Sequence, residues 1–163
     1  MKIFWILIIV LGVVGGGVIG SAFSQNNQKS GKTKMIKKKD FIKLMQQVSD
    51  GWNEGNARKA ADCFAEDAIY TEPPDKQVYV GKQNLFEFFG GDEKPEPPMK
   101  MQWHHLAFDE ETQIGFGEYT FQMNKRYHGI VIVKVKNGKV SNWREYQSQS
   151  NFEWDKFTQN NKF

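Results

Sequence analysis

The chain has 163 residues, which is enough for one domain with its own hydrophobic core. Its formal net charge of +3 hides an uneven distribution: residues 1–39 hold seven lysines and no acidic residue, whereas residues 40–163 hold 15 basic and 19 acidic residues. The larger part therefore carries a net charge of −4, the difference between 15 and 19. Because phosphate binding needs clustered Lys and Arg, an acidic domain argues against nucleic acid as the partner.

Residues 1–24 form a hydrophobic segment with two possible roles. Residues 3–20 are uncharged and reach the lower limit for a membrane-spanning helix. Glycines recur every four residues from Gly12 to Gly20, and six lysines follow the segment while one precedes it, which favours a retained single-span anchor. The alternative is a signal peptide that is cleaved after the small-residue exit at Ala22-Phe23-Ser24, giving a secreted or periplasmic protein.

A polar, basic linker is predicted at residues 25–37, with a lipid surface or solvent beside it. Apolar residues at helical spacing then predict a helix over 41–52, with Asp40 as its N-cap. A shorter helix is expected at 57–64 and a third at 82–89, which Gly90-Gly91 ends. Short strands are expected at 68–71 and 77–80, and three prolines predict a loop at 92–98.

Four longer strands are expected at 99–108, 113–123, 126–136 and 139–149. Asn137-Gly138 separates the last two and is the strongest hairpin signal in the chain. Helices followed by hairpins predict an α+β domain at residues 38–150, in which helices cover one face of an antiparallel sheet. Residues 151–163 form a C-terminal tail whose aromatic residues pack back on the domain as a short cap.

Side-chain alternation assigns the faces of the last hairpin. A two-residue turn at Asn137-Gly138 pairs Ile132 with Trp143, Ile130 with Glu145 and His128 with Gln147, on one face of the sheet. The opposite face then carries a second apolar set, namely Val131, Val133, Val135 and Val140 with Arg144 and Tyr146. A large aromatic surface beside an ionisable group, as at Trp143 and Glu145, is typical of a small-molecule pocket.

The order of several short motifs resembles the SnoaL-like proteins of the nuclear-transport-factor-2-like superfamily. The resemblance spans about residues 38–150, and its motifs are Trp52-Asn53-Glu54-Gly55-Asn56, Phe64-Ala65-Glu66-Asp67-Ala68, Gly81 before a helix, Gly138-Lys139-Val140 and Trp143-Arg144-Glu145-Tyr146. It implies a cone-shaped fold, in which a curved sheet wraps on N-terminal helices around a central pocket. Function does not follow from this fold, because the superfamily holds isomerases, hydrolases, cyclases, dehydratases and proteins without catalysis.

The resemblance implies that Trp143 and Glu145 line the pocket, as the Trp and the acid of epoxide hydrolases in this superfamily do. Ile130, Ile132 and His128 would then share the pocket face, and the Val131/Val133/Tyr146 face would be covered in a homodimer. Tyr70 matches a water-positioning Tyr of those hydrolases, whereas Glu72 stands where they have Asn. Their Arg–Asp pair is missing from Gly117-Glu118-Tyr119-Thr120, and the catalytic Asp of ketosteroid isomerases is not recognisable either.

The strand at 113–123 extends this assignment. A tight turn at Asn124-Lys125 places Tyr119 and Phe121 on the pocket side and Glu118 on the opposite face, near Arg144. A loop one residue longer reverses this arrangement. His104 and His105 are neighbours on a strand, so alternation points them to opposite faces and can bring one of them to the pocket.

Two functions remain open for this pocket. In the first, the pocket binds a small apolar or aromatic molecule without turning it over. In the second, desolvation beside Trp143 makes Glu145 a general acid or base, with Tyr70 or Tyr119 donating a hydrogen bond and His128 moving a proton, in a cofactor-independent isomerase, cyclase or hydrolase. A salt bridge to a basic neighbour is the structural alternative for Glu145. No metal-ligand spacing or dinucleotide fingerprint is present, and no cofactor is expected.

Overall fold

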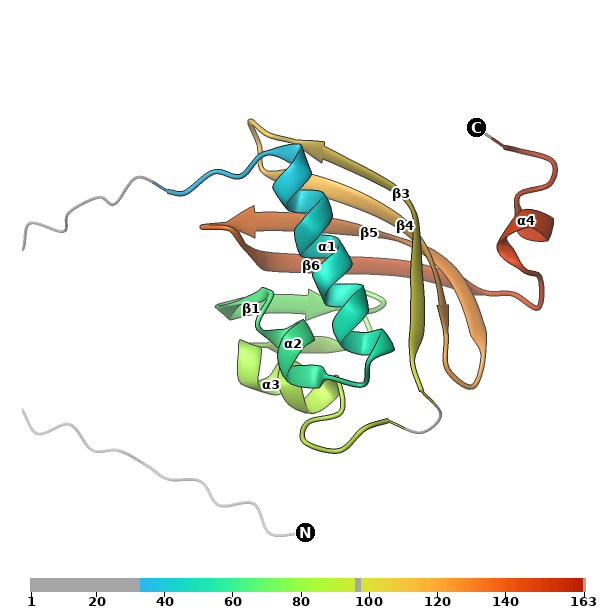
Figure 1. Cartoon of the computed structure of the whole chain (residues 1–163), viewed down its shortest axis with the longest axis horizontal. Coiled ribbons are helices and arrows are strands. Elements are labelled where there is room, and N and C mark those ends of the chain that lie inside the picture. Colours follow the sequence, from blue (N-terminus) through green and yellow to red (C-terminus); the bar gives the residue numbers. More distant parts are fainter. Residues whose placement is uncertain (1–32, 96–97, 163) are drawn as a thin grey trace, which may run out of the picture. The chain divides into compact units, whose positions relative to one another are not determined.

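The computed structural model describes residues 33–95 and 98–162, which form a strongly curved six-stranded sheet with helices on one of its faces (Figure 1). The strand order is β2-β1-β6-β5-β4-β3. All neighbouring strands are antiparallel except β1 and β6, which run parallel. The predicted α+β class is confirmed. The parallel pair departs from the expected antiparallel sheet, since no hairpin constrains two strands so far apart in the chain.

Three helices cover the inner face of the sheet: α1 (Lys38–Asn53), α2 (Ala57–Ala61) and α3 (Lys82–Phe88). The buried side of α1 has the predicted spacing, with Phe41, Leu44, Met45, Val48 and Trp52. Its N-cap is Lys37, and Asp40 lies in the first turn instead, where a negative charge favours the helix dipole. The second helix is shorter than predicted because Phe64 begins a strand.

The strands are β1 (Phe64–Thr71), β2 (Val78–Val80), β3 (Lys100–Asp109), β4 (Ile114–Gln122), β5 (Arg126–Lys136) and β6 (Lys139–Gln149). Asn137 and Gly138 have φ angles of 54° and 82°, as a two-residue hairpin turn requires, and Lys136 pairs with Lys139. The turn that the sequence predicts is therefore present.

A β-bulge next to this turn changes the register that the turn alone predicts. Val135 pairs with Val140, but Lys134 pairs with Asn142, so Ser141 is an extra residue in β6. Beyond the bulge, Val133 pairs with Trp143 and Val131 with Glu145. The predicted pairs of Ile132 with Trp143 and Ile130 with Glu145 are therefore wrong, and both isoleucines lie on the outer face of the sheet.

A second difference from the prediction, in the loop after β4, cancels the effect of the Ser141 bulge on the faces of β4. The loop between β4 and β5 holds three residues, because Gln122 pairs with Arg126, and not the predicted two. The longer loop reverses the faces of β4 relative to β5, but the bulge has already reversed β5 relative to β6. Tyr119 therefore still points inward and is fully buried, opposite Gly129. Glu118 points outward, where His105 contacts it at 2.7 Å.

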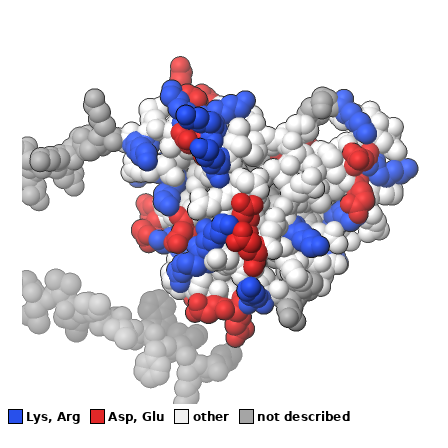
Figure 2. All heavy atoms as spheres, viewed as in Figure 1, with Lys and Arg blue, Asp and Glu red and all other residues white. Residues whose placement is uncertain are grey.

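The outer face of the sheet remains apolar, although its residues differ from those expected. Val131 and Val133 are fully buried on the inner face, so they cannot form the predicted dimer surface. Tyr146 does lie outside, where it is 44% exposed, and the other exposed apolar side chains on this face are Ile69, Val78, Val80, Phe116 and Ile130. On the face of the molecule that Figure 2 shows, acidic and basic side chains are interspersed.

The C-terminal tail packs on the outer face through α4 (Trp154–Phe157). Trp154 stacks on the His104 ring with 3.7 Å between ring centroids, and Phe157 lies 4.3 Å from the His128 ring. A bulge between Trp103 and His105 turns both His104 and His105 outward, so the expectation that neighbouring histidines point to opposite faces is wrong. Phe152 and Phe157 of the predicted cap nevertheless keep about half of their surface exposed, at 54% and 46%.

The described part of the predicted linker, residues 33–37, is ordered against the sheet. The Ile36 N–H donates to Gln113 Oε1 at 2.9 Å, and Gln113 Nε2 donates back to the Ile36 carbonyl at 3.0 Å. No helix in residues 33–95 and 98–162 is long and apolar enough to cross a membrane. The anchor or signal segment at residues 1–24 lies outside the described residues.

The Ile36–Gln113 pair supports the first prediction. We expect Gln113→Ala to lower the free energy of unfolding by about 1–3 kcal/mol, because it leaves a buried backbone N–H and C=O without partners. Urea unfolding measures this, with Gln83→Ala on the exposed side of α3 as the control. Equal losses in the two variants would contradict the assigned role of the pair.

Candidate functional site

A cavity of about 280 Å³ lies between the inner face of the sheet and the ends of α1 and α3. Its volume is at the lower end of ligand pockets, which run from roughly 300 to 1,000 Å³. Most of its lining is aromatic or sulfur-containing. The polar groups of the lining residues are two carboxyls, an amide, a phenol and the Trp52 indole N–H, which has no hydrogen-bond partner among the described residues. The lining residues are Trp52, Tyr70, Glu72, Gln77, Phe88, Phe89, Gly90, Pro95, Met99, Met101, Phe121, Met123 and Glu145.

The Glu145 carboxyl lies at the inner end of the cavity and is held by three hydrogen-bond donors. The Tyr70 hydroxyl donates to Oε2 at 2.6 Å, and the Trp143 indole N–H donates to the same oxygen at 2.9 Å. The Tyr119 hydroxyl donates to Oε1. Burial raises the pKa of Glu145, whereas these three hydrogen bonds favour the ionised form and limit the rise.

Glu72 is a second carboxyl in the same cavity, nearer to solvent. Gln147 Nε2 donates to its Oε1, and the Tyr70 hydroxyl oxygen lies 3.2 Å from its Oε2. Burial, and after it the charge of Glu145, raises the pKa of Glu72 to about 7. Glu72 is therefore partly protonated near neutral pH, which is unusual for a glutamate.

The Tyr70 hydroxyl links the two carboxyls. A phenol has one hydrogen to donate, and Tyr70 lies between carboxylate oxygens of Glu145 and Glu72. The shorter contact, to Glu145, takes this hydrogen. The longer contact, from the Tyr70 hydroxyl to Glu72 Oε2, competes for the same hydrogen and favours the ionised form of Glu72. Glu72, Tyr70 and Glu145 thus form one hydrogen-bonded chain.

Both tyrosines are fixed as donors. Burial and the charge of Glu145 raise the pKa of Tyr70 and of Tyr119 well above the usual value, so both stay protonated. Gly129 on the neighbouring strand leaves room for Tyr119, since a Cβ at that position would approach the Tyr119 hydroxyl oxygen to 2.5 Å. A glycine in the middle of β5 is thus required by the ring packed over it.

The structure brings most of the residues predicted for the site together, but not all. Glu145, Tyr70, Glu72 and Phe121 line the cavity. Trp143 and Tyr119 lie behind the lining and contact Glu145 directly. Ile130 and Ile132 lie on the outer face, because the Ser141 bulge changes the register between β5 and β6.

His128 is not part of this site, contrary to the expected role in proton transfer. It is buried on the outer face beneath α4, where its Nε2 donates to the Phe152 carbonyl at 2.9 Å and its Nδ1 lies 2.9 Å from the Thr120 hydroxyl. The sheet separates it from Glu145, so it has no path to the cavity.

Sequence reasoning missed the apolar wall of the cavity. Trp52 was expected only as a core residue of α1, and the Phe88-Phe89 pair only as the buried side of α3. The three lining methionines, Met99, Met101 and Met123, carry no local signal, because their common position depends on how the β3 and β4 ends close over the helices. Two adjacent phenylalanines before Gly90-Gly91 are the one pattern that could have indicated this wall.

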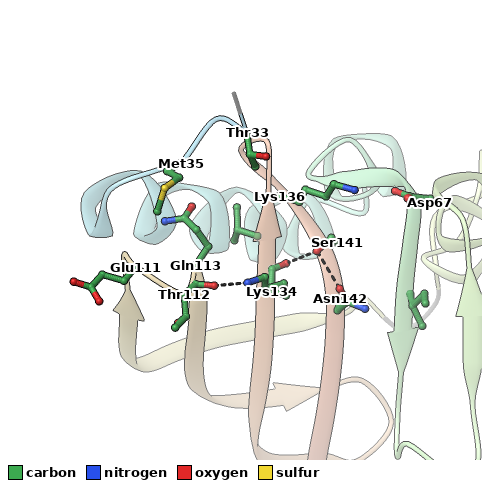
Figure 3. Close-up of a pocket in the computed structure, with 12 residues that line it drawn as sticks. Thr33, Met35, Asp67, Glu111, Thr112, Gln113, Lys134, Lys136, Ser141 and Asn142 are labelled. Atoms are coloured by element: carbon green, nitrogen blue, oxygen red, sulfur yellow. Dashed lines mark hydrogen bonds between the residues drawn. The ribbon is translucent and has the colours of Figure 1, made fainter. Parts of the chain in front are cut away.

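A larger hollow of about 470 Å³ lies on the other face, beside the Ser141 bulge (Figure 3). Its polar groups already bond to one another: the Lys134 ammonium donates to the Thr112 carbonyl, and the Ser141 hydroxyl lies 3.0 Å from Asn142 Oδ1. Lys134, Lys136, Asp67 and Glu111 give it mixed charge. Since it is open and internally satisfied, it is the weaker candidate. In residues 33–95 and 98–162, no three His, Cys, Asp or Glu side chains are grouped to hold a metal ion.

The raised pKa of Glu72 leads to a second prediction. Unfolded Glu72 loses its proton near pH 4.5, whereas folded Glu72 keeps it to about pH 7. Its contribution to stability is therefore complete below pH 4.5 and is lost as the pH rises through 7. We expect the unfolding free energy of wild type minus that of Glu72→Gln to fall over this range, measured by urea unfolding at several pH values.

The control for this measurement is Glu87→Gln, which changes an exposed carboxyl on α3. The difference between wild type and this control should not change with pH between 4.5 and 7. A pH-independent difference for Glu72→Gln as well would show that Glu72 titrates as an ordinary glutamate.

Comparisons with known proteins agree with this geometry. The SnoaL-like domain family matches residues 45–143. A cystatin-like-fold protein of unknown function from Methylobium petroleophilum has 18% identity and a TM-score of 0.63, covering 74% of this chain and 84% of its own. An LEH-like epoxide hydrolase of M. tuberculosis has 12% identity and a TM-score of 0.59, with coverages of 68% and 84%.

A putative ketosteroid isomerase from Kribbella flavida has 19% identity and a TM-score of 0.57, covering 71% of this chain and 83% of its own. At such identities these structures share the fold, and nothing more is carried over from them. No curated protein matches the chain. The family match covers more than half of the sequence and agrees with the curved sheet and its cavity, so the chain belongs to the SnoaL-like domain family.

Proposed function

We propose that this protein binds a small, mostly apolar molecule in the cavity that ends at Glu145. The observation that carries the proposal is the lining itself: aromatic and methionine side chains surround the space, and the polar atoms converge at one end. Apolar walls supply affinity, and a few fixed polar groups orient the ligand. The small volume limits the ligand to about the size of a substituted single ring.

Binding can be tested with 2-phenylethanol, a neutral aromatic probe, by isothermal titration calorimetry. We expect saturable binding to wild type and at least about tenfold weaker binding to Met123→Trp, because the larger side chain fills the cavity mouth. Ile42→Trp adds the same group to the exposed side of α1 and should bind like wild type. Equal binding by both variants would mean that the probe adsorbs elsewhere.

Acid–base catalysis is the second candidate function, and the two carboxyls linked by Tyr70 favour it. Glu72, with a pKa of about 7, can donate a proton at neutral pH, and Tyr70 links it to the Glu145 carboxylate. Such a pair suits isomerisation, cyclisation, dehydration or hydrolysis without a cofactor. The absence of an Arg–Asp pair in β4 argues against the mechanism of the epoxide hydrolases.

The two functions separate in a deuterium-exchange experiment. Phenylacetone carries exchangeable hydrogens next to its carbonyl, and proton NMR in D2O follows their loss. Catalysis predicts faster exchange with wild type than with Glu145→Gln or Glu72→Gln, at unchanged probe affinity. Exchange that is the same in all three proteins assigns the cavity to binding alone. Circular dichroism of both variants checks that their fold is intact.

Assembly and location remain predictions. We propose a homodimer through the outer face, supported by exposed Ile69, Phe116, Ile130 and Tyr146, whose burial in a partner would remove apolar surface from water. We also keep the proposed membrane anchor at residues 1–24. Sedimentation of wild type and Ile130→Glu tests the dimer: the charge should shift the protein to a monomer, whereas a monomeric wild type would refute it.

A further inference from the structure

We propose that the ligand of this cavity is a lipophilic cation, namely a small amine whose ammonium group is held by Glu72 and Glu145 while its apolar body contacts the aromatic wall. This inference rests on the proposed binding function and specifies its ligand class. The feature that carries it is a mismatch of charge: the cavity contains two carboxyl groups and no positive charge to balance them.

The lining shows this mismatch directly. Its ionisable groups among the described residues are Glu72, Glu145 and the phenol of Tyr70, and none of the lining residues is Lys, Arg or His. No basic group contributes to the pKa of either carboxyl, and the charge of Glu145 raises the pKa of Glu72. On the face of the molecule that Figure 2 shows, by contrast, acidic and basic side chains are interspersed. The unbalanced negative charge is therefore a property of the cavity.

Of the two carboxyls, Glu72 is the one that can still bond to a ligand. Three donors already surround the Glu145 carboxyl. Glu72 accepts from the Gln147 amide and, over a longer contact of 3.2 Å, from the Tyr70 hydroxyl, which also donates to Glu145. An ammonium group has three N–H donors, so it can take the place of a proton on Glu72 and bond to this carboxyl while reducing the repulsion between the carboxyls.

The rest of the wall also favours a cation. Trp52, Tyr70, Phe88, Phe89 and Phe121 surround the space with aromatic rings, whose negative faces attract ammonium groups. Three methionine sulfurs add polarizable surface. A ligand with a carboxylate or phosphate would meet two carboxyls here, and none of the described lining residues carries a positive charge to neutralise it.

Three probes of the same size test the charge preference at pH 8 by calorimetry: 2-phenylethylamine, 2-phenylethanol and phenylacetate, which are a cation, a neutral molecule and an anion. We expect the amine to bind at least about tenfold more tightly than the alcohol, equivalent to about 1.4 kcal/mol, and phenylacetate to bind most weakly. From pH 6 to pH 8 the amine should bind more tightly as it displaces the proton of Glu72, while the alcohol should not.

Variants assign the preference to Glu72. Glu72→Gln should reduce the ratio of amine to alcohol affinity and keep alcohol binding, whereas Glu87→Gln, an exposed change on α3, should keep the full ratio. An alcohol or phenylacetate that binds as tightly as the amine overturns the cation proposal but leaves the proposed binding function standing. Failure of all three probes to bind overturns both, and a full amine preference in Glu72→Gln overturns the role given to Glu72.

Discussion

A carboxyl group buried in an apolar interior is the constraint on which the rest of this site depends. Removing a carboxylate from water costs several kcal/mol unless hydrogen bonds replace the solvent. Glu145 obtains those bonds from three different strands: Tyr70 on β1, Tyr119 on β4 and Trp143 on β6. The curvature of the sheet is what lets side chains from strands two apart reach one point. Tyr70 lines the cavity, and Tyr119 and Trp143 lie directly behind its lining, so packing and ligand chemistry are set together.

Much of this fold could be predicted from the sequence, because the signals involved are local. The period of α1, the Asn137-Gly138 turn and the alternation in the long strands each depend on a few neighbouring residues. The register between neighbouring strands, by contrast, is not determined by a few neighbouring residues. Ser141 has no feature that marks it as a bulge, yet this one residue moves Ile130 and Ile132 to the outside and brings Val131 and Val133 to the core.

The same distinction between local signals and strand register decides which site residues could be predicted. Trp143 and Glu145 lie two apart on one strand, so their shared face could be predicted without knowing any register. Tyr119 was placed correctly only because the longer β4–β5 loop and the Ser141 bulge compensate for each other. His128 and the His104-His105 pair could not be placed, since their positions depend on bulges and on where α4 docks. The common position of Met99, Met101 and Met123 in the cavity lining depends on how the whole sheet closes over the helices.

The account rests on the two carboxyls, Glu72 and Glu145, that the Tyr70 hydroxyl links. Carbon-13 NMR of labelled glutamate carboxyls, titrated from pH 3 to pH 9, reports the protonation of each carboxyl, and Glu72→Gln and Glu145→Gln assign the signals. The account predicts that the Glu72 carboxyl titrates near pH 7 and that the Glu145 signal shifts over the same pH range. Two independent titrations, both complete below about pH 5, would contradict it.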